Sequence, residues 1–179
     1  MKEQGFDLQK DIGKIANVKM GDRLLVSGIL YTVRDKVHRE ISDRIRNKES
    51  LPFDIKNSTI YYCGPSPKPD GKIVGACGPT TSKRMDRFTP LLLENGLKIM
   101  IGKGDRGEEV KNAIVKNKAL YLTVTGGAAA LLASHVIEFD LVAFDELGPE
   151  ACYRMVVIDF PCIVAIDSIG SNIYNKNGR

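Results

Sequence analysis

Apolar residues recur along this chain with two different periods, which predict strands and helices in alternation. Residues 23–33 form a run rich in β-branched and apolar side chains, which is typical of a strand. Residues 34–48 are mostly charged but carry Val37, Ile41 and Ile45 at helical spacing, which predicts an amphipathic helix with one buried stripe. Strands that alternate with helices in this way indicate an α/β fold.

Three further stretches repeat one device, in which an apolar strand-like run leads through a glycine turn into the start of a helix. The run at 73–74 is followed by a helix expected to start at 80, the run at 97–101 by one expected to start at 105, and the run at 119–125 by one expected to start at 128. Ligands of open α/β sheets usually bind at the carboxyl ends of strands, and the N–H groups of a helix start favour anions. The first two turns are therefore candidate anion sites. In the third, Gly126 and Gly127 precede small alanines, which favours close helix packing over ligand binding.

The remaining strand-like pieces lie toward the two ends of the chain. They are expected at 58–63, 136–144, 153–158, 162–166 and 172–174. We expect a tight connection at 159–161 and a solvated acidic turn at 145–150. Strand-only pieces beside alternating units indicate a layered domain with a mixed sheet arrangement.

The N-terminal segment, residues 1–20, is polar with scattered apolar positions and is expected to be an arm or short helix without a core of its own. The folded domain is expected over residues 21–174, followed by a frayed tail at 175–179. With 179 residues, 43% hydrophobic and 27% charged, the chain is long enough for one sizeable core. We therefore expect a single domain.

Charge and hydropathy limit the function classes. The net charge of +4 is modest and spread along the chain, so nucleic-acid binding has little support. No run of 18 apolar residues occurs and the N-terminus has no apolar signal core, so no membrane association is expected and a cytoplasmic location is predicted. The cysteines Cys63, Cys77, Cys152 and Cys162 show no C-x-x-C spacing, which argues against a self-contained zinc or iron–sulfur site and for reduced structural thiols.

Arg34 and His38 lie one turn apart at the start of the helix expected over 34–48. A cation at a helix N-terminus opposes the macrodipole, so Arg34 needs an anion nearby. That anion is either a ligand or a carboxylate of the protein, such as Asp35 or a neighbouring acid. For His38, a surface or packed histidine is favoured over a proton-transfer role.

The two glycine turns add a hydroxyl and two further cations. If a helix opens at Thr80, Arg84 lies one turn further on the same face, so that a hydroxyl and a guanidinium could grip one carboxylate. Lys103 would lie at the carboxyl end of the strand at 97–101. Neither turn matches G-x-x-x-x-G-K-[ST] or G-x-G-x-x-G, and a turn of this kind can also be only a helix cap. The residues thus predict a small anionic ligand, with carboxylate and phosphate both open.

Several longer segments, in this order, resemble one known family. They are GDRLLVSGILYTVRDKVH, YYCGPSPKPDGKIVGACGPTTSKRMD, GKGDR, TGGAAALLA and ELGPEACYRMVVIDFPCIVAIDSIG. Together they resemble the β subunit, or C-terminal domain, of the class I iron–sulfur hydro-lyases, the fumarase and L(+)-tartrate dehydratase group. The resemblance implies a swivelling β/β/α domain, with layered mixed sheets and helices.

The resemblance also implies a site and a partner. The family's β-side substrate ligands fall on Arg34, Thr80, Arg84 and Lys103, and Thr80 is the candidate for a catalytic role in proton transfer, although an unperturbed hydroxyl is a poor base. In the family three cysteines of an α subunit hold a [4Fe–4S] cluster. The chain alone is therefore expected to bind no cofactor, and to need an α subunit in an assembly of the α2β2 type.

The reaction implied is reversible loss of water from a small dicarboxylate, with malate/fumarate and tartrate both open as substrates. A stand-alone, non-catalytic module for small carboxylates or phosphates is the alternative. A purely structural scaffold is a third possibility, but it leaves Arg34, Thr80, Arg84 and Lys103 without a role.

Overall fold

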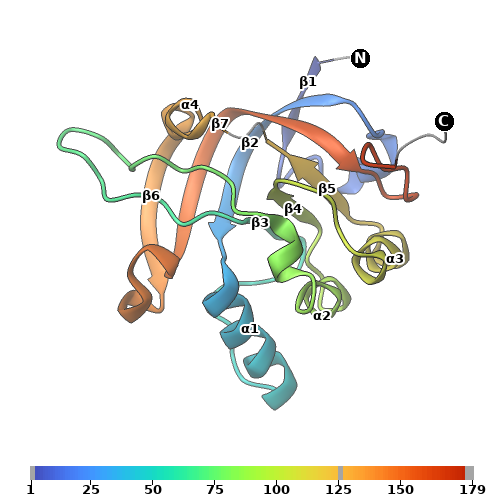
Figure 1. Cartoon of the computed structure of the whole chain (residues 1–179), viewed down its shortest axis with the longest axis horizontal. Coiled ribbons are helices and arrows are strands. Elements are labelled where there is room, and N and C mark those ends of the chain that lie inside the picture. Colours follow the sequence, from blue (N-terminus) through green and yellow to red (C-terminus); the bar gives the residue numbers. More distant parts are fainter. Residues whose placement is uncertain (1–2, 125–126, 176–179) are drawn as a thin grey trace.

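Seven strands form one mixed sheet in the computed structural model of the protein, which describes residues 3–124 and 127–175 (Figure 1). The strands are β1 (Glu3–Asp7), β2 (Arg23–Thr32), β3 (Thr59–Tyr61), β4 (Ile99–Gly102), β5 (Leu120–Thr123), β6 (Val136–Ala143) and β7 (Cys152–Ile166). Their order is β1-β2-β3-β4-β5-β7-β6, with an additional pairing of β2 with β7. Strands β1 to β5 are parallel to one another, and β7 runs antiparallel to β2, β5 and β6. The α/β class predicted from the sequence is confirmed.

Strand β7 closes part of the sheet on itself. It pairs with β5 on one side and with β2 on the other, so that β2, β3, β4, β5 and β7 form a ring. The prediction of two strands joined by a tight turn at 159–161 was wrong, because β7 continues for 15 residues. Asp159 has a positive φ of 51°, and the opposing strand has a bulge between Val26 and Gly28. A bulge bends a strand and increases its twist without ending the pairing.

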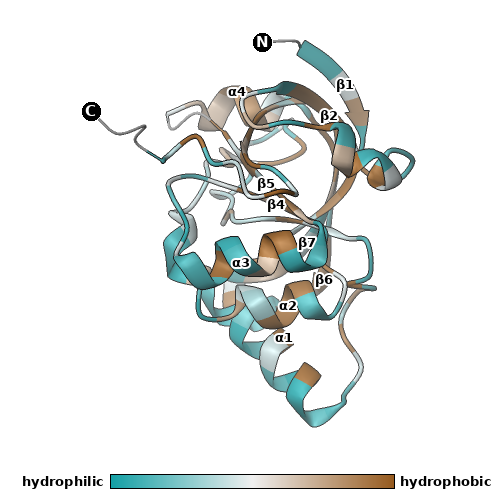
Figure 2. Cartoon of the chain, turned by 90° about the vertical axis from the view of Figure 1, so that its right-hand side faces the viewer, coloured by the Kyte–Doolittle hydropathy of each residue, from teal (hydrophilic) through white to brown (hydrophobic). Residues whose placement is uncertain are grey.

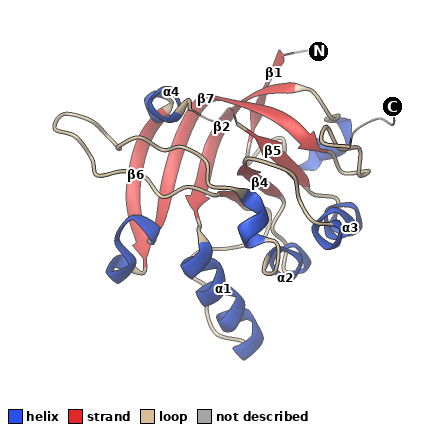
Figure 3. Ribbon diagram, viewed as in Figure 1, coloured by secondary structure: helices blue, strands red, loops and turns tan. Residues whose placement is uncertain are grey.

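The helices lie mainly on one side of this ring. They are α1 (Asp35–Asn47), α2 (Thr89–Glu94), α3 (Glu108–Asn117) and α4 (Ala129–Ser134), with 3-10 turns η1 (Ile12–Asn17), η2 (Ser82–Met85) and η3 (Asp145–Glu150). Figure 2 shows α3, α2 and α1 one after another beneath β4 and β5, whereas α4 lies near β6 and β7 (Figure 3). Within the described residues, none of the helices has the length and apolar content that crossing a bilayer would require.

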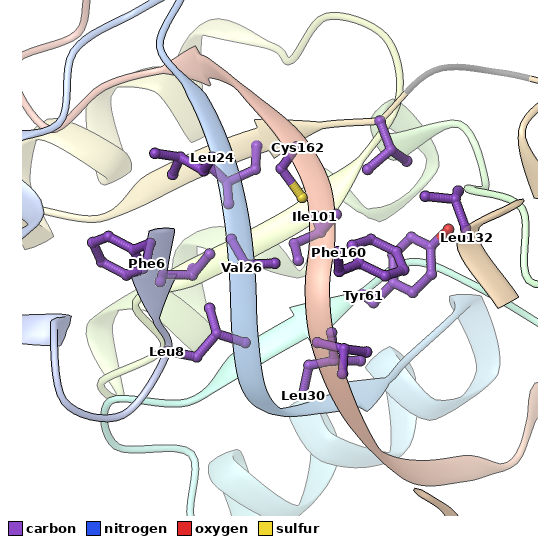
Figure 4. Packing of buried hydrophobic residues seen from close by; sticks show 14 of the residues in the cluster. Phe6, Leu8, Leu24, Val26, Leu30, Tyr61, Ile101, Leu132, Phe160 and Cys162 are labelled. Atoms are coloured by element: carbon purple, nitrogen blue, oxygen red, sulfur yellow. The ribbon is translucent and has the colours of Figure 1, made fainter. Parts of the chain in front are cut away.

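Two hydrophobic cores lie on opposite faces of the parallel strands. In β4, Ile99 and Ile101 point into the ring, where they join residues such as Val26 and Phe160 (Figure 4), and Met100 points to the helices. Tyr121 of β5 likewise faces the helices, between two leucines that face the ring. Strands buried on both faces explain the continuous apolar runs in the sequence. The layers are thus β7 with its neighbours, the parallel strands, and helices α1 to α3. The swivelling β/β/α assignment stays a prediction.

The N-terminal segment, expected to be an arm or short helix without a core of its own, forms strand β1 and the 3-10 turn η1 where the structure describes it. Strand β1 pairs with β2 along its whole length, and Phe6 and Leu8 are buried in the ring core at 5% and 0% exposure. Two apolar side chains separated by one polar residue are too short a pattern to identify a strand, which explains why the sequence did not show it. At the other end, the short strand expected at 172–174 is reduced to one isolated bridge between Ile166 and Asn172.

Candidate functional site

The carboxyl ends of β2, β3 and β4 meet at one end of the parallel strands. Strand β2 leads into Arg34, and β4 leads into Lys103. The segment before η2 lies across the ends of β3 and β4, because Pro79 forms a bridge with Cys63 and Thr81 forms a parallel bridge with Lys103. The four residues predicted from the sequence to bind a ligand are placed at this end: Arg34, Thr80, Arg84 and Lys103.

Arg34 is the residue before α1, and its guanidinium is held between two neighbouring segments. Nη2 lies 3.5 Å from Oε1 of Glu150, and the two side chains are 21% and 24% exposed. On another side is Gly64, where a Cβ atom would lie 2.6 Å from Nη1. The acid of the protein near Arg34 is thus Glu150, whereas Asp35 pairs with Arg84, and binding of a ligand by Arg34 stays a prediction. The prediction that 145–150 is only a solvated turn was wrong for Glu150.

Arg84 makes a two-point ion pair with Asp35. Nε donates a hydrogen bond of 3.1 Å to Oδ1, and Nη2 lies 2.9 Å from Oδ2. The Arg84 side chain is 52% exposed and that of Asp35 is 24% exposed. Since Asp35 directly follows Arg34, both guanidiniums lie at the N-terminus of α1. A pocket of ≈ 320 Å³ beside Asp35 is lined by α1 and by Leu147 of η3.

Thr80 is placed at this end of the sheet, but not on a helix. Helix η2 begins only at Ser82, so the prediction that Thr80 and Arg84 share one helix face was wrong. The N–H group of Thr80 donates to the Tyr62 carbonyl at 2.6 Å, and that of Ser82 donates to the Lys103 carbonyl at 2.9 Å. The backbone donors expected to bind an anion here are therefore used to attach this segment to β3 and β4.

Lys103 is fixed through its backbone. Its N–H group donates to Oγ of Ser82 at 3.0 Å, and its carbonyl accepts from the N–H group of the same residue. Within residues 3–124 and 127–175, its ammonium forms no salt bridge. A cation of this kind is available to an anionic ligand.

A third arginine, Arg106, was not singled out by the sequence. It joins the segment that carries Lys103 to the segment that carries Arg84. Its side chain is fully buried, and Nε lies 2.7 Å from Oδ1 of Asp86, whose other oxygen accepts a 2.6 Å hydrogen bond from the N–H group of Gly107. Nη2 donates to Thr89 at 2.8 Å, and the guanidinium lies 5.2 Å from the ring centroid of Tyr62. Both members of the ion pair stand in the segments SKRMD and GKGDR, but nothing in their spacing shows that they meet.

His38 is a packed histidine, as the favoured interpretation of the sequence held. It is 0% exposed, its Nδ1 lies 2.9 Å from the carbonyl of Arg34, and its ring lies 5.3 Å from that of Tyr62. Burial of the imidazole lowers the pKa of His38 from 6.5 to about 4. The neutral ring at physiological pH is therefore a structural contact between α1 and Tyr62.

The four cysteines lie inside the fold. All four are free and at most 3% exposed, and burial raises the pKa of the Cys152 thiol to about 12. Across the described parts of the chain, no three His, Cys, Asp or Glu side chains gather in a way that could hold a metal ion. The donor set of these residues therefore does not fit an iron–sulfur cluster.

The chain is similar to known proteins along almost its whole length. The family described as "Fumarase C-terminus" matches residues 2–177. Fumarate hydratase 2 of Leishmania major is 38% identical over 176 residues, which cover 95% of this chain and 31% of that protein. The putative L(+)-tartrate dehydratase subunit beta of Methanocaldococcus jannaschii is 38% identical over 174 residues, which cover 94% of this chain and 88% of that protein. L(+)-tartrate dehydratase subunit beta of Escherichia coli K12 is 34% identical over 170 residues, with 92% and 83% covered.

The two kinds of relative differ in length. The match with this chain covers about a third of the length of the fumarate hydratases and more than four fifths of the length of the tartrate dehydratase β subunits. In both cases the matched region contains the ends of β2, β3 and β4 with the four candidate residues, since it covers more than nine tenths of this chain. This chain belongs to the fumarase C-terminus family, which joins class I fumarate hydratases and the β subunits of L(+)-tartrate dehydratases.

Proposed function

We propose that this chain is the β part of an iron–sulfur hydro-lyase of the fumarate hydratase or L(+)-tartrate dehydratase type. It would bind the carboxylates of a four-carbon 2-hydroxydicarboxylate and support the reversible loss of water. The observation that carries this proposal is that Arg34, Arg84 and Lys103 come from three separate segments and lie at one end of the parallel strands. Membership of the family supports the same reading.

The chemistry explains why several cations are needed. A hydrogen next to a carboxylate is weakly acidic, so its removal leaves a carbanion-like state with high negative charge. Fixed guanidinium and ammonium groups stabilise such charge best in a site closed to water. In this proposal Arg34 and Arg84 bind the carboxylates through their planar forks. Lys103 adds a third positive charge.

Thr80 is the one uncharged side chain of the four positions. Its hydroxyl would bind the substrate and stand near the proton that is transferred. Because an unperturbed hydroxyl is a poor base, proton transfer through Thr80 needs a stronger base on the partner chain.

The proposal requires a partner. Two relatives are named as β subunits, and the fumarate hydratases are about three times as long as the matched region. We therefore propose an α subunit that holds the [4Fe–4S] cluster and an assembly of the α2β2 type, because the buried thiols of this chain do not fit a cluster. Movement of this domain as a swivelling unit would close the site over the substrate and exclude water.

The test is anaerobic reconstitution of the chain with the α subunit of an L(+)-tartrate dehydratase or with the N-terminal part of a class I fumarate hydratase. Activity is measured with fumarate, L-malate and L(+)-tartrate. We expect turnover of one of these substrates and loss of more than 100-fold on Arg84→Ala, since bidentate charge-assisted contacts are among the strong ones. Arg87→Ala, a change at an exposed arginine of the same segment, should keep activity.

Turnover that survives Arg84→Ala would reject the role assigned to this residue. If the chain instead bound dicarboxylates by itself and no tested partner produced activity, the non-catalytic module would be the better description.

A further inference from the structure

Arg84 is held along one edge of its guanidinium only. The Nε–Nη2 edge faces the carboxylate of Asp35: Nε donates to Oδ1 at 3.1 Å, and Nη2 lies 2.9 Å from Oδ2, which accepts no well-aligned hydrogen bond within the described residues. Nη1 of Arg84 makes no hydrogen bond within the described residues, and the Arg84 side chain is 52% exposed. An arginine held in this way keeps its position and can still offer two N–H groups to a ligand carboxylate.

Arg34 is held in a similar but looser way. Only its Nη2 is near Glu150, and the distance of 3.5 Å is longer than a charge-assisted hydrogen bond. Nε of Arg34 and Oε2 of Glu150 are both shielded from solvent and have no partner within the described residues. Buried polar atoms normally find partners, so this pair is incomplete as it stands. Gly64 leaves the room in which the guanidinium lies, since a Cβ there would be 2.6 Å from Nη1.

Both acids differ from ordinary surface partners. The side chains of Asp35 and Glu150 are each 24% exposed, whereas Asp43, which pairs with Arg46 in the same helix α1, is 54% exposed. Exposed pairs contribute little, because water screens them. The charge of a carboxylate that is largely withdrawn from water is screened less, so it orients a neighbouring arginine more than an exposed partner does.

We infer that Asp35 and Glu150 are positioning residues of the dicarboxylate site, each fixing one edge of an arginine so that the other edge faces the ligand. This inference rests on the proposed function and deepens it, because it states why the site prefers two carboxylates over one. The two arginines stand at the N-terminus of one helix, and Asp35 links them, since it follows Arg34 and binds Arg84. Their separation, and with it the spacing between the two ligand carboxylates, is set by these two acids.

The test uses Asp35→Asn and Glu150→Gln in the hydro-lyase assembled with its α partner. Each substitution keeps the size of the side chain and removes its charge. Matched controls are Asp43→Asn, which breaks the 2.9 Å pair with Arg46 on the same helix, and Glu138→Gln, which breaks the 2.8 Å contact with Arg154 on the sheet. Inhibition constants are measured for succinate, a dicarboxylate, and for butyrate, a monocarboxylate of the same chain length.

We expect each positioning variant to weaken succinate inhibition about tenfold or more, the range for a hydrogen bond to a charged group, and to change butyrate inhibition much less. The ratio of the two constants is the informative readout, because a variant that merely loosens the fold weakens both ligands alike. The controls should leave the ratio unchanged. If the unmodified assembly is active and the ratio of the succinate and butyrate inhibition constants is the same in Asp35→Asn and Glu150→Gln as in the unmodified assembly, the inference is overturned.

A second arm separates this inference from the proposed function. The isolated chain is titrated with succinate while the Nε–H resonances of Arg34 and Arg84 are followed by NMR. If the assembled protein shows no turnover but succinate shifts these resonances in the wild type and not in the two variants, the positioning role stands and the hydro-lyase proposal fails. If there is no turnover and no shift, both are overturned.

Discussion

Three arginines near the ends of the parallel strands meet carboxylates at three degrees of burial. The Arg106 side chain is 0% exposed beside Asp86, Arg34 is 21% exposed beside Glu150, and Arg84 is 52% exposed beside Asp35. Arginine therefore has a different role at each of these three positions. Of these three arginines, Arg106 has protein groups at all three guanidinium nitrogens, and the other two do not within the described residues, which suits Arg106 as a structural support rather than a ligand contact.

Substitution of Arg106 by alanine is expected to lower the free energy of unfolding by about 3–5 kcal/mol, because Asp86 would be left as an uncompensated, partly buried charge. The measurement is urea unfolding of the chain followed by circular dichroism. Arg154→Ala, at a pair on the sheet whose arginine is 31% exposed, should cost no more than about 1 kcal/mol. Equal effects of the two changes would contradict the structural role of Arg106.

His38 is expected to make the fold sensitive to acid. Burial lowers its pKa from 6.5 to about 4 in the folded state, with the charge of Arg106 acting in the same direction and that of Asp35 against it. Since the folded state binds the proton less well than the unfolded state, the contribution of His38 is complete above pH 6.5 and is lost as the pH falls toward 4. The total is on the order of 3 kcal/mol.

The measurement for His38 compares the free energy of unfolding at several pH values between 7 and 4, in the wild type and in His38→Gln. Carboxylates titrate in both proteins, so the difference between the two curves isolates the histidine. The difference should shrink steadily as the pH falls. Parallel curves would show that the imidazole is not held in its neutral form.

Among the elements, the pairing of β2 with β7 depends on an irregularity that the sequence did not reveal. Gly28 has a φ of 123°, and the backbone of the next residue, Ile29, exchanges two hydrogen bonds with the side chain of Gln9, at 2.9 and 3.0 Å. The N–H group of Asp159 on β7 donates to Oγ of Ser27 at 3.0 Å. The Gln9 contacts bind the side of β2 that faces β1, and the Ser27–Asp159 contact spans β2 and β7 at the bulge, on both sides of which the pairing with β7 continues.

Replacement of Gly28 by alanine is expected to cost about 1–3 kcal/mol, because the positive φ is strained for any other residue and the new Cβ would clash with Oε1 of Gln9. Thermal and urea unfolding both measure this cost. Gly5→Ala on neighbouring β1 is the control, since its Cβ would meet no atom within 4 Å and its φ is not positive. A Gly28→Ala protein as stable as the control would mean that the bulge relaxes without loss.

The elements that could be predicted are those whose pattern is local. Helix α1 and strands β2, β4 and β5 follow from their own periodicity, within one or two residues of the expected bounds, and α3 begins three residues after the expected start at 105. The placement of Arg34 and Lys103 at strand ends also follows from that periodicity. The features that could not be predicted from the sequence depend on residues far away in the chain. The continuity of β7 depends on Gly28, and the partial burial of Glu150 depends on Arg34. The helix expected from Thr80 fails because residues 79–82 pair with β3 and β4 instead.

At the scale of the whole molecule, the ring of strands is a rigid frame, and the loops that leave it carry the candidate site. Each of β2, β3, β4, β5 and β7 has a strand on both sides, so none of them is an open edge within the ring. The candidate residues lie on connections that leave the ring at one end (Figure 1). A closed ring with cores on both faces of its parallel strands resists bending, because any change of curvature breaks hydrogen bonds and packing together.

Domain closure over a substrate should therefore move this chain as one body and change order only at its ligand-binding end. Hydrogen–deuterium exchange of the assembled hydro-lyase, with and without succinate, tests this expectation. We expect slower exchange at residues 34–38, 79–85 and 102–107, where the ligand contacts and the connections lie. Exchange in β2, β4 and β7 should stay slow and unchanged, since those amides are paired in the ring. Faster exchange in β7 on binding would mean that closure opens the ring, which is incompatible with a swivelling movement of a rigid domain.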